Sequence, residues 1–182
     1  MTVYTMRGGN LKVGFVDLCN YVHSKIGDSL SIIEIGVYTG EVTEILSNIF
    51  PNSKIFSIDI WEKYIESCST YDLEKQAVEL KEAEIIFDEK LKFLKNVTKC
   101  KMSSVEYSKL VENHTIDFCY IDGNHQTSSV MEDIQHWLPK IKAGKIISGH
   151  DYHWPSVRKA VDIVFQKSPE KTFIDGSWLY TV

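Results

Sequence analysis

The feature that most constrains the fold of this chain is the alternation of short apolar segments with longer amphipathic segments. Short apolar runs predict buried strands, and apolar residues spaced three or four positions apart predict helices. The predicted strands span 31–35, 54–58, 98–102, 116–121 and 145–148. Ile141 is expected to end the helix before the last of them, and Gly144 to turn the chain into it. Strands that alternate with helices in this way form a parallel sheet with helices on both faces.

The two ends of the chain complete the expected architecture. An N-terminal helix is predicted before the first strand, and Gly27 is placed to end it. Residues 171–174 and 178–181 flank Asp175-Gly176-Ser177, a sequence that favours a hairpin turn. The expected fold class is therefore α/β: a Rossmann-like, doubly wound and mostly parallel sheet with a C-terminal antiparallel hairpin. Such sheets bind ligands beyond the carboxyl ends of their strands.

Length and composition limit the classes of protein to consider. With 182 residues, the chain has the size of one domain with one core. We expect a single domain over 1–182, with an N-terminal helical segment over 1–30 and a lid and helix over 61–96. A lid this short could be completed by a second subunit, so a homo-oligomer is a candidate assembly.

No partner other than a small molecule is favoured by the composition. The net charge of −5 comes without a long basic run, which disfavours nucleic acid. The apolar runs fall short of the roughly 20 residues of a membrane span, and MTVYTMRGGN lacks the apolar core of a secretory signal. The four cysteines form no CxxC pair, so neither a zinc site nor a disulfide framework is indicated. A reducing cytoplasm is the expected location.

The first predicted strand leads into a glycine turn. Glu34, Gly36 and Gly40 form an acid followed by two glycines four residues apart, with the next helix starting behind them. Glycines at these places let the backbone turn tightly and pass close to a ligand. The spacing differs from the GxGxxG of dinucleotide-binding folds. An acid at this strand end suits a ligand with a positively charged amino group better than one with phosphates.

The second predicted strand ends in another acid. Asp59 lies about 20 residues after the glycine turn, where such folds place a carboxylate that bonds ribose hydroxyls. A solvated strand-end carboxylate or a helix cap is the alternative explanation. Trp61, two positions on, is a candidate cover for a base or sugar, although packing explains an aromatic residue here equally well.

Together, the segments EIGVYTG, SIDIW, DFCYIDGNH and KAGKIISGHDY resemble the class I S-adenosylmethionine-dependent methyltransferases, and most closely the branch with small-molecule O-methyltransferases. The resemblance extends from Ser31 to the end of the chain and is weakest over 61–95. It implies S-adenosylmethionine as cofactor and a small molecule as methyl acceptor. The cofactor-binding residues that it implies, together with the candidate Trp61, are Glu34, Gly36, Tyr38, Gly40, Asp59, Ser103, Ser104 and Asp122.

A second group of candidate residues follows the fourth and fifth predicted strands. Similar metal-dependent O-methyltransferases have an acid at the position of Asp122 and an acid–acid or acid–amide pair at the position of His150 and Asp151. These three residues are the predicted ligands of a divalent cation, Mg²⁺ or Mn²⁺. His150 departs from the family pattern, and imidazole favours Mn²⁺, Fe²⁺ or Zn²⁺ over Mg²⁺. A loop cap without metal is the alternative.

Catalysis requires removal of a proton from the acceptor. His125 and His153 are both candidate bases because imidazole titrates near neutral pH. Asn124 stands where related enzymes often have an aspartate, which removes one candidate base. Asp122, His125 and His150 are the predicted catalytic residues, and Tyr152 and Trp154 are candidates for the acceptor pocket.

Three other functions compete with methyl transfer. A domain that binds S-adenosylmethionine without catalysis, as a sensor or partner subunit, would keep Glu34, Asp59 and Asp122. A nicotinamide-dependent dehydrogenase is disfavoured by the absence of GxGxxG. An enzyme that methylates amino groups of nucleic acids is expected to end its fourth strand in a DPPY-like motif, and this strand ends in IDGN. Methyl transfer to a hydroxyl oxygen is therefore the leading hypothesis.

Overall fold

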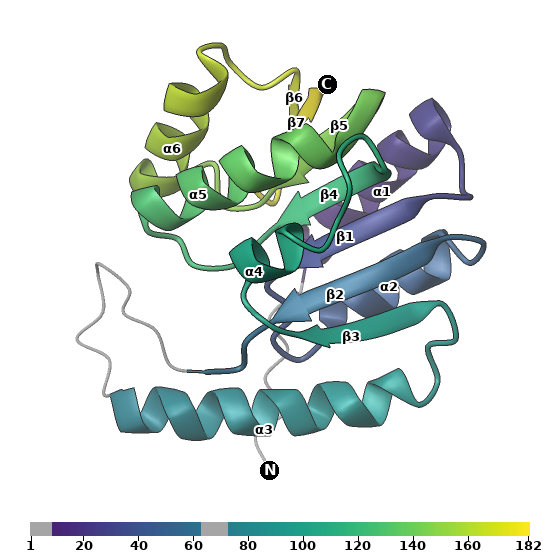
Figure 1. Ribbon diagram of the computed structural model, residues 1–182, viewed down its shortest axis with the longest axis vertical. Helices are drawn as coiled ribbons and strands as arrows, with labels where there is room; N and C mark the ends of the chain where they lie inside the picture. Colours follow the sequence, from purple (N-terminus) through teal and green to yellow (C-terminus); the bar gives the residue numbers. More distant parts are fainter. Residues whose placement is uncertain (1–8, 63–72) are drawn as a thin grey trace.

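The computed structural model describes residues 9–62 and 73–182, apart from the side chains of residues 10, 11 and 73 (Figure 1). Residues 1–8 of the predicted N-terminal segment and residues 63–72 of the predicted lid lie outside the described residues. The helices are α1 (Asn10–Ile26), α2 (Glu41–Ile49), α3 (Leu73–Leu91), α4 (Ser104–Ser108), α5 (Thr127–Trp137), the 3₁₀ turn η1 (Leu138–Lys140) and α6 (Pro155–Phe165). The strands are β1 (Ser31–Ile35), β2 (Lys54–Asp59), β3 (Val97–Lys101), β4 (Ile116–Ile121), β5 (Ile141–Gly149), β6 (Lys171–Thr172) and β7 (Trp178–Thr181).

The seven strands form one sheet in the order β3-β2-β1-β4-β5-β7-β6. Strands β1 to β5 run parallel, and β7 pairs antiparallel with both β5 and β6. The strand order reverses at β1, which pairs with β2 on one side and β4 on the other. This is the topological switch point at which open α/β sheets bind ligands. The predicted fold class and the C-terminal hairpin are confirmed.

The fifth strand is longer than predicted. It begins at Ile141, which we expected to end the preceding helix, and Gly144 lies inside it. The helix stops at Trp137 because Pro139 in the following 3₁₀ turn has no N–H to donate. The pairing with β4 shifts register between Ile116 and Phe118, and Gly144 has a φ of +75°. The glycine therefore accommodates a bulge rather than a turn into the strand.

Helices cover both faces of the sheet, as Figure 1 shows. On one face, α1 and α2 pack a cluster that includes Phe15, Leu18 and Leu46. On the other, α5 and α6 pack a cluster that includes Ile134, Trp137 and Val161. Helix α3 lies beside β3 at the edge of the sheet. In the part of the chain that is described, no helix has both the length and the apolar character needed to cross a membrane.

Candidate functional site

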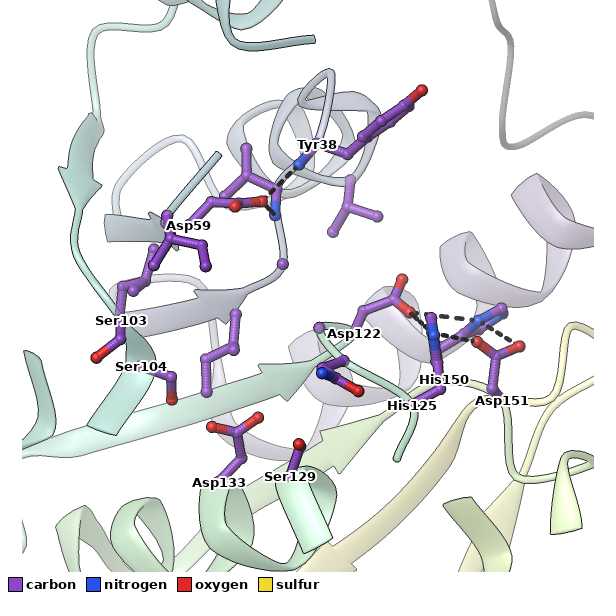
Figure 2. A pocket seen from close by; sticks show the side chains of 18 of the residues that line it. Tyr38, Asp59, Ser103, Ser104, Asp122, His125, Ser129, Asp133, His150 and Asp151 are labelled. Atoms are coloured by element: carbon purple, nitrogen blue, oxygen red, sulfur yellow. Dashed lines mark hydrogen bonds and ion pairs between the residues drawn. The ribbon is translucent and has the colours of Figure 1, made fainter. Parts of the chain in front are cut away.

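A cavity of about 760 Å³ opens at the carboxyl ends of the parallel strands. The loops after β1 to β5 and one face of α3 line it, and the size is typical of sites for small organic ligands. Twelve of the residues singled out in the sequence line this cavity: Gly36, Tyr38, Asp59, Ser103, Ser104, Asp122, Asn124, His125, His150, Asp151, His153 and Trp154. Glu34, Gly40 and Trp61 do not line it. Figure 2 shows the labelled side chains gathered around this space.

Asp59 holds the glycine turn in place. One carboxylate oxygen accepts hydrogen bonds from the backbone N–H groups of Val37 (2.8 Å) and Tyr38 (3.0 Å), and the other accepts one from Trp61 (2.8 Å). Tyr38 has a φ of +52°, a conformation that is strained for a residue with a side chain. The bonds from Asp59 stabilise that conformation. The predicted bonds from Asp59 to ribose hydroxyls stay a prediction.

Glu34 lies beneath the glycine turn and is fully buried. Its Oε2 accepts hydrogen bonds from the hydroxyls of Thr43 on α2 (2.6 Å) and Ser57 on β2 (2.7 Å). A buried carboxylate requires such partners, because desolvation of an unpaired charge is costly. Glu34 therefore ties β1 to α2 and β2, and its predicted contact with the methionine part of the cofactor stays a prediction.

The two glycines and Trp61 pack the walls of the turn. A Cβ on Gly36 would overlap the carbonyl oxygen of Asp122, and one on Gly40 would overlap the ring of Phe87. Trp61 is 4% exposed, stacks on Phe87 with ring centroids 5.4 Å apart, and donates its indole N–H to Tyr38 O. Packing is therefore the interpretation that the structure supports for Trp61.

The two serines after β3 have different roles. Ser103 caps α4 by accepting a hydrogen bond from the N–H of Glu106 (3.2 Å). Ser104 Oγ accepts a hydrogen bond from the indole N–H of Trp137 (2.7 Å) and bonds the buried carboxylate of Asp133 on α5. Both serines line the cavity together with Asp133. Burial raises the pKa of Asp133 to about 6, although the bond from Ser104 acts in the opposite direction.

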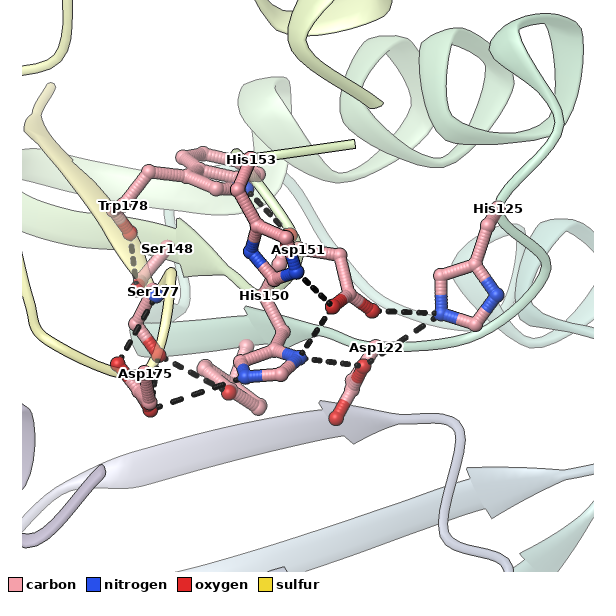
Figure 3. A network of polar contacts seen from close by, with 10 residues as sticks. Asp122, His125, Ser148, His150, Asp151, His153, Asp175, Ser177 and Trp178 are labelled. Atoms are coloured by element: carbon pink, nitrogen blue, oxygen red, sulfur yellow. Dashed lines mark hydrogen bonds and ion pairs between the residues drawn. The ribbon is translucent and has the colours of Figure 1, made fainter. Parts of the chain in front are cut away.

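Histidines and aspartates form a polar network at another side of the cavity (Figure 3). Asp122 follows β4, and His150 and Asp151 follow β5, so the pairing of these two strands brings them together. Asp151 is at the centre: its Oδ2 lies 2.9 Å from His125 Nε2, and its Oδ1 lies 3.1 Å from His150 Nδ1. Asp122 Oδ1 lies 3.6 Å from His150 Nδ1 and 3.8 Å from His125 Nε2.

Asp151 is ionised in this network. Burial alone would raise the pKa of its carboxyl, but hydrogen bonds and positive charge from His125 and His150 hold that pKa well below its usual range. Its φ of +57° is unusual for a residue with a side chain. A strained backbone at such a position indicates that the surroundings fix the side chain precisely.

A third acid approaches the network from the C-terminal hairpin. Asp175 is buried and accepts hydrogen bonds from the N–H (3.0 Å) and the hydroxyl (2.8 Å) of Ser177. Its Oδ2 lies 3.8 Å from His150 Nε2. His150 therefore has carboxylates on both sides: Asp122 and Asp151 at Nδ1, and Asp175 at Nε2. A carboxylate behind a histidine fixes the orientation of its ring.

One group of side chains in the described residues has the spacing of a metal site. Donor atoms of Asp122, His125 and Asp151 all lie within 4.8 Å of one another. This group contains His125, which we had singled out as a base, in place of His150, which we had predicted as a ligand. His150 Nδ1 nevertheless lies next to both carboxylates.

The remaining candidates lie at the mouth of the cavity or away from it. His153 and Trp154 line the cavity, and the Trp154 ring lies 4.8 Å from that of His125. Tyr152 does not line the cavity; its hydroxyl donates to Asp162 on α6. Asn124 accepts a hydrogen bond from the N–H of Gln126 (2.9 Å), which makes it a turn residue before α5.

Comparison with known protein families identifies the family to which this chain belongs. A family model described as a methyltransferase domain matches residues 33–152, which include the glycine turn, Asp59 and the histidine–aspartate network. The chain belongs to this methyltransferase family. More exactly, it is a member of the class I S-adenosylmethionine-dependent methyltransferases, as its motifs predicted. A search of curated proteins found no match to this chain.

Solved structures share the fold of the methyltransferase at low sequence identity. The O-methyltransferase NovP is 13% identical with a TM-score of 0.60; the match covers 93% of this chain and 78% of NovP. SMU.1697c from Streptococcus mutans, solved with S-adenosylhomocysteine, is 15% identical with a TM-score of 0.61 over 96% of this chain and 97% of its own. An rRNA methylase from Streptococcus thermophilus is 12% identical with a TM-score of 0.60 over 96% of each chain.

Sequence reasoning missed two buried acids of this methyltransferase. Asp133 has the spacing of the buried stripe of α5, with Val130, Ile134 and Trp137, and an acid on an apolar stripe was a usable signal. Asp175 was considered only as part of a turn. No local pattern marks it, because its neighbour His150 is 25 residues away in the sequence.

Proposed function

We propose that this methyltransferase transfers the methyl group of S-adenosylmethionine to a hydroxyl oxygen of a small molecule, with the help of a divalent cation. The observation that carries the proposal is the group Asp122, His125 and Asp151, whose donor atoms lie within 4.8 Å of one another in the wall of the cavity. Two carboxylates this close repel each other unless a positive charge lies between or beside them.

The donor set fits a cation. Two ligands of a cation with bonds of about 2.1 Å are at most about 4.2 Å apart, so small side-chain shifts would close this group around one ion. Two carboxylates with one imidazole suit Mn²⁺ better than Mg²⁺. When bound, the cation would lower the pKa of an acceptor hydroxyl beside it. His150, held between Asp151 and Asp175, would keep Asp151 in place.

The transfer itself needs little from the protein beyond position and proton removal. The acceptor oxygen attacks the methyl carbon, the bond from that carbon to sulfur breaks, and S-adenosylhomocysteine leaves with the electron pair on sulfur. The acceptor proton goes to His153, whose Nε2 lies 3.7 Å from Asp151 Oδ1 and whose side chain is 58% exposed. From there the proton can reach solvent.

A mechanism without a cation is the second candidate. His125 Nε2 lies 2.9 Å from Asp151 Oδ2, and a carboxylate–imidazole pair of this kind is suited to general base catalysis. In this mechanism His125 is the base, and Asp122 and Asp151 stabilise its positive charge. The two mechanisms differ in the need for a cation and in the base, which is His153 with the cation and His125 without it.

The mouth of the cavity favours a small aromatic acceptor. Trp154 is 40% exposed and its ring lies against His125, which offers a flat apolar surface beside the polar network. The net charge of −5 disfavours RNA, although an rRNA methylase shares the fold.

Methyl transfer can be tested with radiolabelled S-adenosylmethionine and three acceptor pools: small hydroxylated aromatics, small amines, and ribosomal RNA. We expect label in the hydroxylated pool, loss of transfer in excess EDTA, and recovery with added Mn²⁺. Full activity in excess EDTA would mean that no cation is required, and His125 would then be the base. Label only in the amine or RNA pool would contradict the proposal that the methyl acceptor is a small hydroxylated molecule. Binding of S-adenosylhomocysteine without transfer to any pool would favour the non-catalytic alternative.

The cation has a readout of its own. Electron paramagnetic resonance of the free ion measures Mn²⁺ binding. We expect the unchanged chain to bind Mn²⁺, and we expect Asp122→Asn and Asp151→Asn to lose that binding. Asp17→Asn, an exposed change of the same kind on α1, is the matched control and should bind Mn²⁺ normally.

A further inference from the structure

Helix α3 forms a wall of the cavity to which the proposed transfer assigns no role. Gln76, Glu79 and Leu80 line the cavity, and their spacing of three and four residues places them on one face of the N-terminal half of α3. Figure 1 shows this end of α3 on the side of the molecule toward which β2 and β3 point. The wall is therefore placed to contact the part of the methyl acceptor that does not react.

Glu79 has a fixed position in this wall. It is half-buried, and its Oε1 accepts a hydrogen bond from the hydroxyl of Tyr38 at 2.6 Å. The backbone of Tyr38 is held in turn by Asp59 and by the indole N–H of Trp61. Phe87 anchors α3 to the same turn by stacking on Trp61. The carboxylate of Glu79 is thus oriented by the turn after β1 as well as by its own helix.

The lining of the cavity is strongly acidic. Among the residues that the structure describes, no lysine or arginine lines it. The acidic residues that line it are Glu41, Asp59, Glu79, Asp122, Glu132, Asp133 and Asp151. Asp122 and Asp151 belong to the network assigned to the cation, and Asp59 holds the glycine turn. A lining of one sign attracts a ligand group of opposite charge and disfavours an anionic one.

Aromatic rings accompany the acid in this lining. Tyr38 lines the cavity and bonds Glu79, and Trp154 is 40% exposed at the mouth. The face of an aromatic ring attracts a cation, and a carboxylate makes strong hydrogen bonds with an ammonium group. A carboxylate accepts several hydrogen bonds at once, so Glu79 can bind such a group together with the Tyr38 hydroxyl.

We infer that Glu79 determines the specificity for the methyl acceptor by binding a protonated amino group, so that the acceptor is a hydroxylated aromatic amine rather than a hydroxylated aromatic acid. This inference rests on the proposed function. The reacting hydroxyl of the acceptor lies at the histidine–aspartate network, and its ammonium group lies at Glu79. An acid of the same shape would bring a second carboxylate to Glu79, and like charges at such a place select against the wrong ligand.

The test compares tyramine with para-hydroxyphenylacetate, which share the ring and the hydroxyl but carry opposite charges. Methyl ether formation by the full chain with S-adenosylmethionine and Mn²⁺ should show a kcat/KM about tenfold higher for tyramine, the scale of a hydrogen bond between charged groups. Glu79→Gln should reduce this preference to about threefold or less, because the amide carries no charge. Glu82→Gln makes the same change on the exposed face of α3 and should keep the full preference.

The ratio of the two kcat/KM values separates recognition from a structural role. A purely structural Glu79 would lower both values equally in Glu79→Gln and leave the ratio unchanged, which would overturn the inference. Glu79→Lys gives a second measurement if the first variant folds poorly, and it should reverse the preference in favour of the acid. Equal values for the two probes with the unchanged chain would also overturn the inference.

A second comparison covers the case in which neither probe is methylated. The amine and acid members of the hydroxylated pool are then compared in the same way, and label confined to acids or to uncharged members would overturn the inference. Absence of label from the entire hydroxylated pool, or methylation of the amine nitrogen, would instead contradict the proposed function, so the two failures are distinguishable.

Discussion

At Asp133, two effects on one carboxyl group oppose each other. Burial disfavours the charged form, and the hydrogen bond from Ser104 favours it; burial is the larger effect, and the pKa rises to about 6. Glu132 acts in the direction of burial, and His136 acts against it. Asp151 shows the opposite balance, because two histidines contact it and hold its pKa well below the usual range. Burial therefore decides the direction of the pKa shift at Asp133, and the two histidines decide it at Asp151.

The raised pKa predicts a pH-dependent stability. Between the ordinary value of 3.8 and about 6, the folded chain keeps a proton on Asp133 that the unfolded chain releases. The free energy of unfolding therefore falls as pH rises through this window, by about 3 kcal/mol, and falls no further above it. Asp133→Asn removes this loss. Relative to the unchanged chain, the variant should gain up to about 3 kcal/mol between pH 4 and pH 7.5 in urea unfolding.

Asp17→Asn is the control for this measurement, since an exposed acid should give the same difference at both pH values. All other groups titrate alike in the compared proteins and cancel. A difference between Asp133→Asn and the unchanged chain that stays constant from pH 4 to pH 7.5 would mean that Asp133 has an ordinary pKa in the folded state.

At the scale of elements, the sequence predicted those strands best whose apolar runs are unbroken. Residues 31–35 and 116–121 are predicted and observed with the same bounds, because both strands lie in the middle of the sheet and are buried on both faces. The start of β5 was missed, because a bulge at Gly144 breaks the apolar run and a glycine inside a strand resembles a turn.

The candidate site was predictable to the extent that strand ends locate it. Asp59, Asp122 and Asp151 follow β2, β4 and β5, and the topology alone brings them to one edge. The partners of each side chain were not predictable, because they come from distant segments. Glu34 bonds Thr43 and Ser57, and these contacts depend on how α2 and β2 pack on β1.

Gly36 is the junction between two elements, and this predicts a large effect of a small change. It has a φ of +85°, and a Cβ there would overlap the carbonyl of Asp122 after β4. Gly36→Ala should lower the free energy of unfolding by more than about 2 kcal/mol, from backbone strain together with overpacking. It should also weaken S-adenosylhomocysteine binding, because the turn lines the cavity. Urea unfolding and calorimetry measure the two effects.

Gly27→Ala separates strain from overlap in this prediction. Gly27 has nearly the same φ, +86°, but a Cβ there would meet no atom within 4 Å. The control should therefore cost only about 1 kcal/mol and leave ligand binding unchanged. Equal costs for the two variants would show that the contact of Gly36 with the β4 end does not constrain the turn.

At the scale of the whole molecule, the cavity brings together segments that are not all neighbours in the sheet. Loops after β1 to β5 line it together with α3, so a ligand that fills it would contact nearly every layer of the fold. The Asp59 bonds to the turn after β1 and the histidine–aspartate network after β4 and β5 are the two rigid sides of this space.

This arrangement predicts that the cofactor product stabilises the entire fold rather than one loop. A ligand that binds only the folded state adds about 2.7 kcal/mol at one hundred times its Kd. For a chain of this length that corresponds to an increase in Tm of about 5–10 °C. Thermal unfolding followed by circular dichroism, which reports on the whole sheet, should show a single transition that moves upward with S-adenosylhomocysteine.

NAD is the control and should leave Tm unchanged, because the turn after β1 lacks the GxGxxG spacing for a pyrophosphate. An increase in Tm with NAD and none with millimolar S-adenosylhomocysteine would contradict S-adenosylmethionine as the cofactor. An increase with S-adenosylhomocysteine confined to part of the transition would instead mean that the ligand joins fewer elements than the lining of the cavity implies.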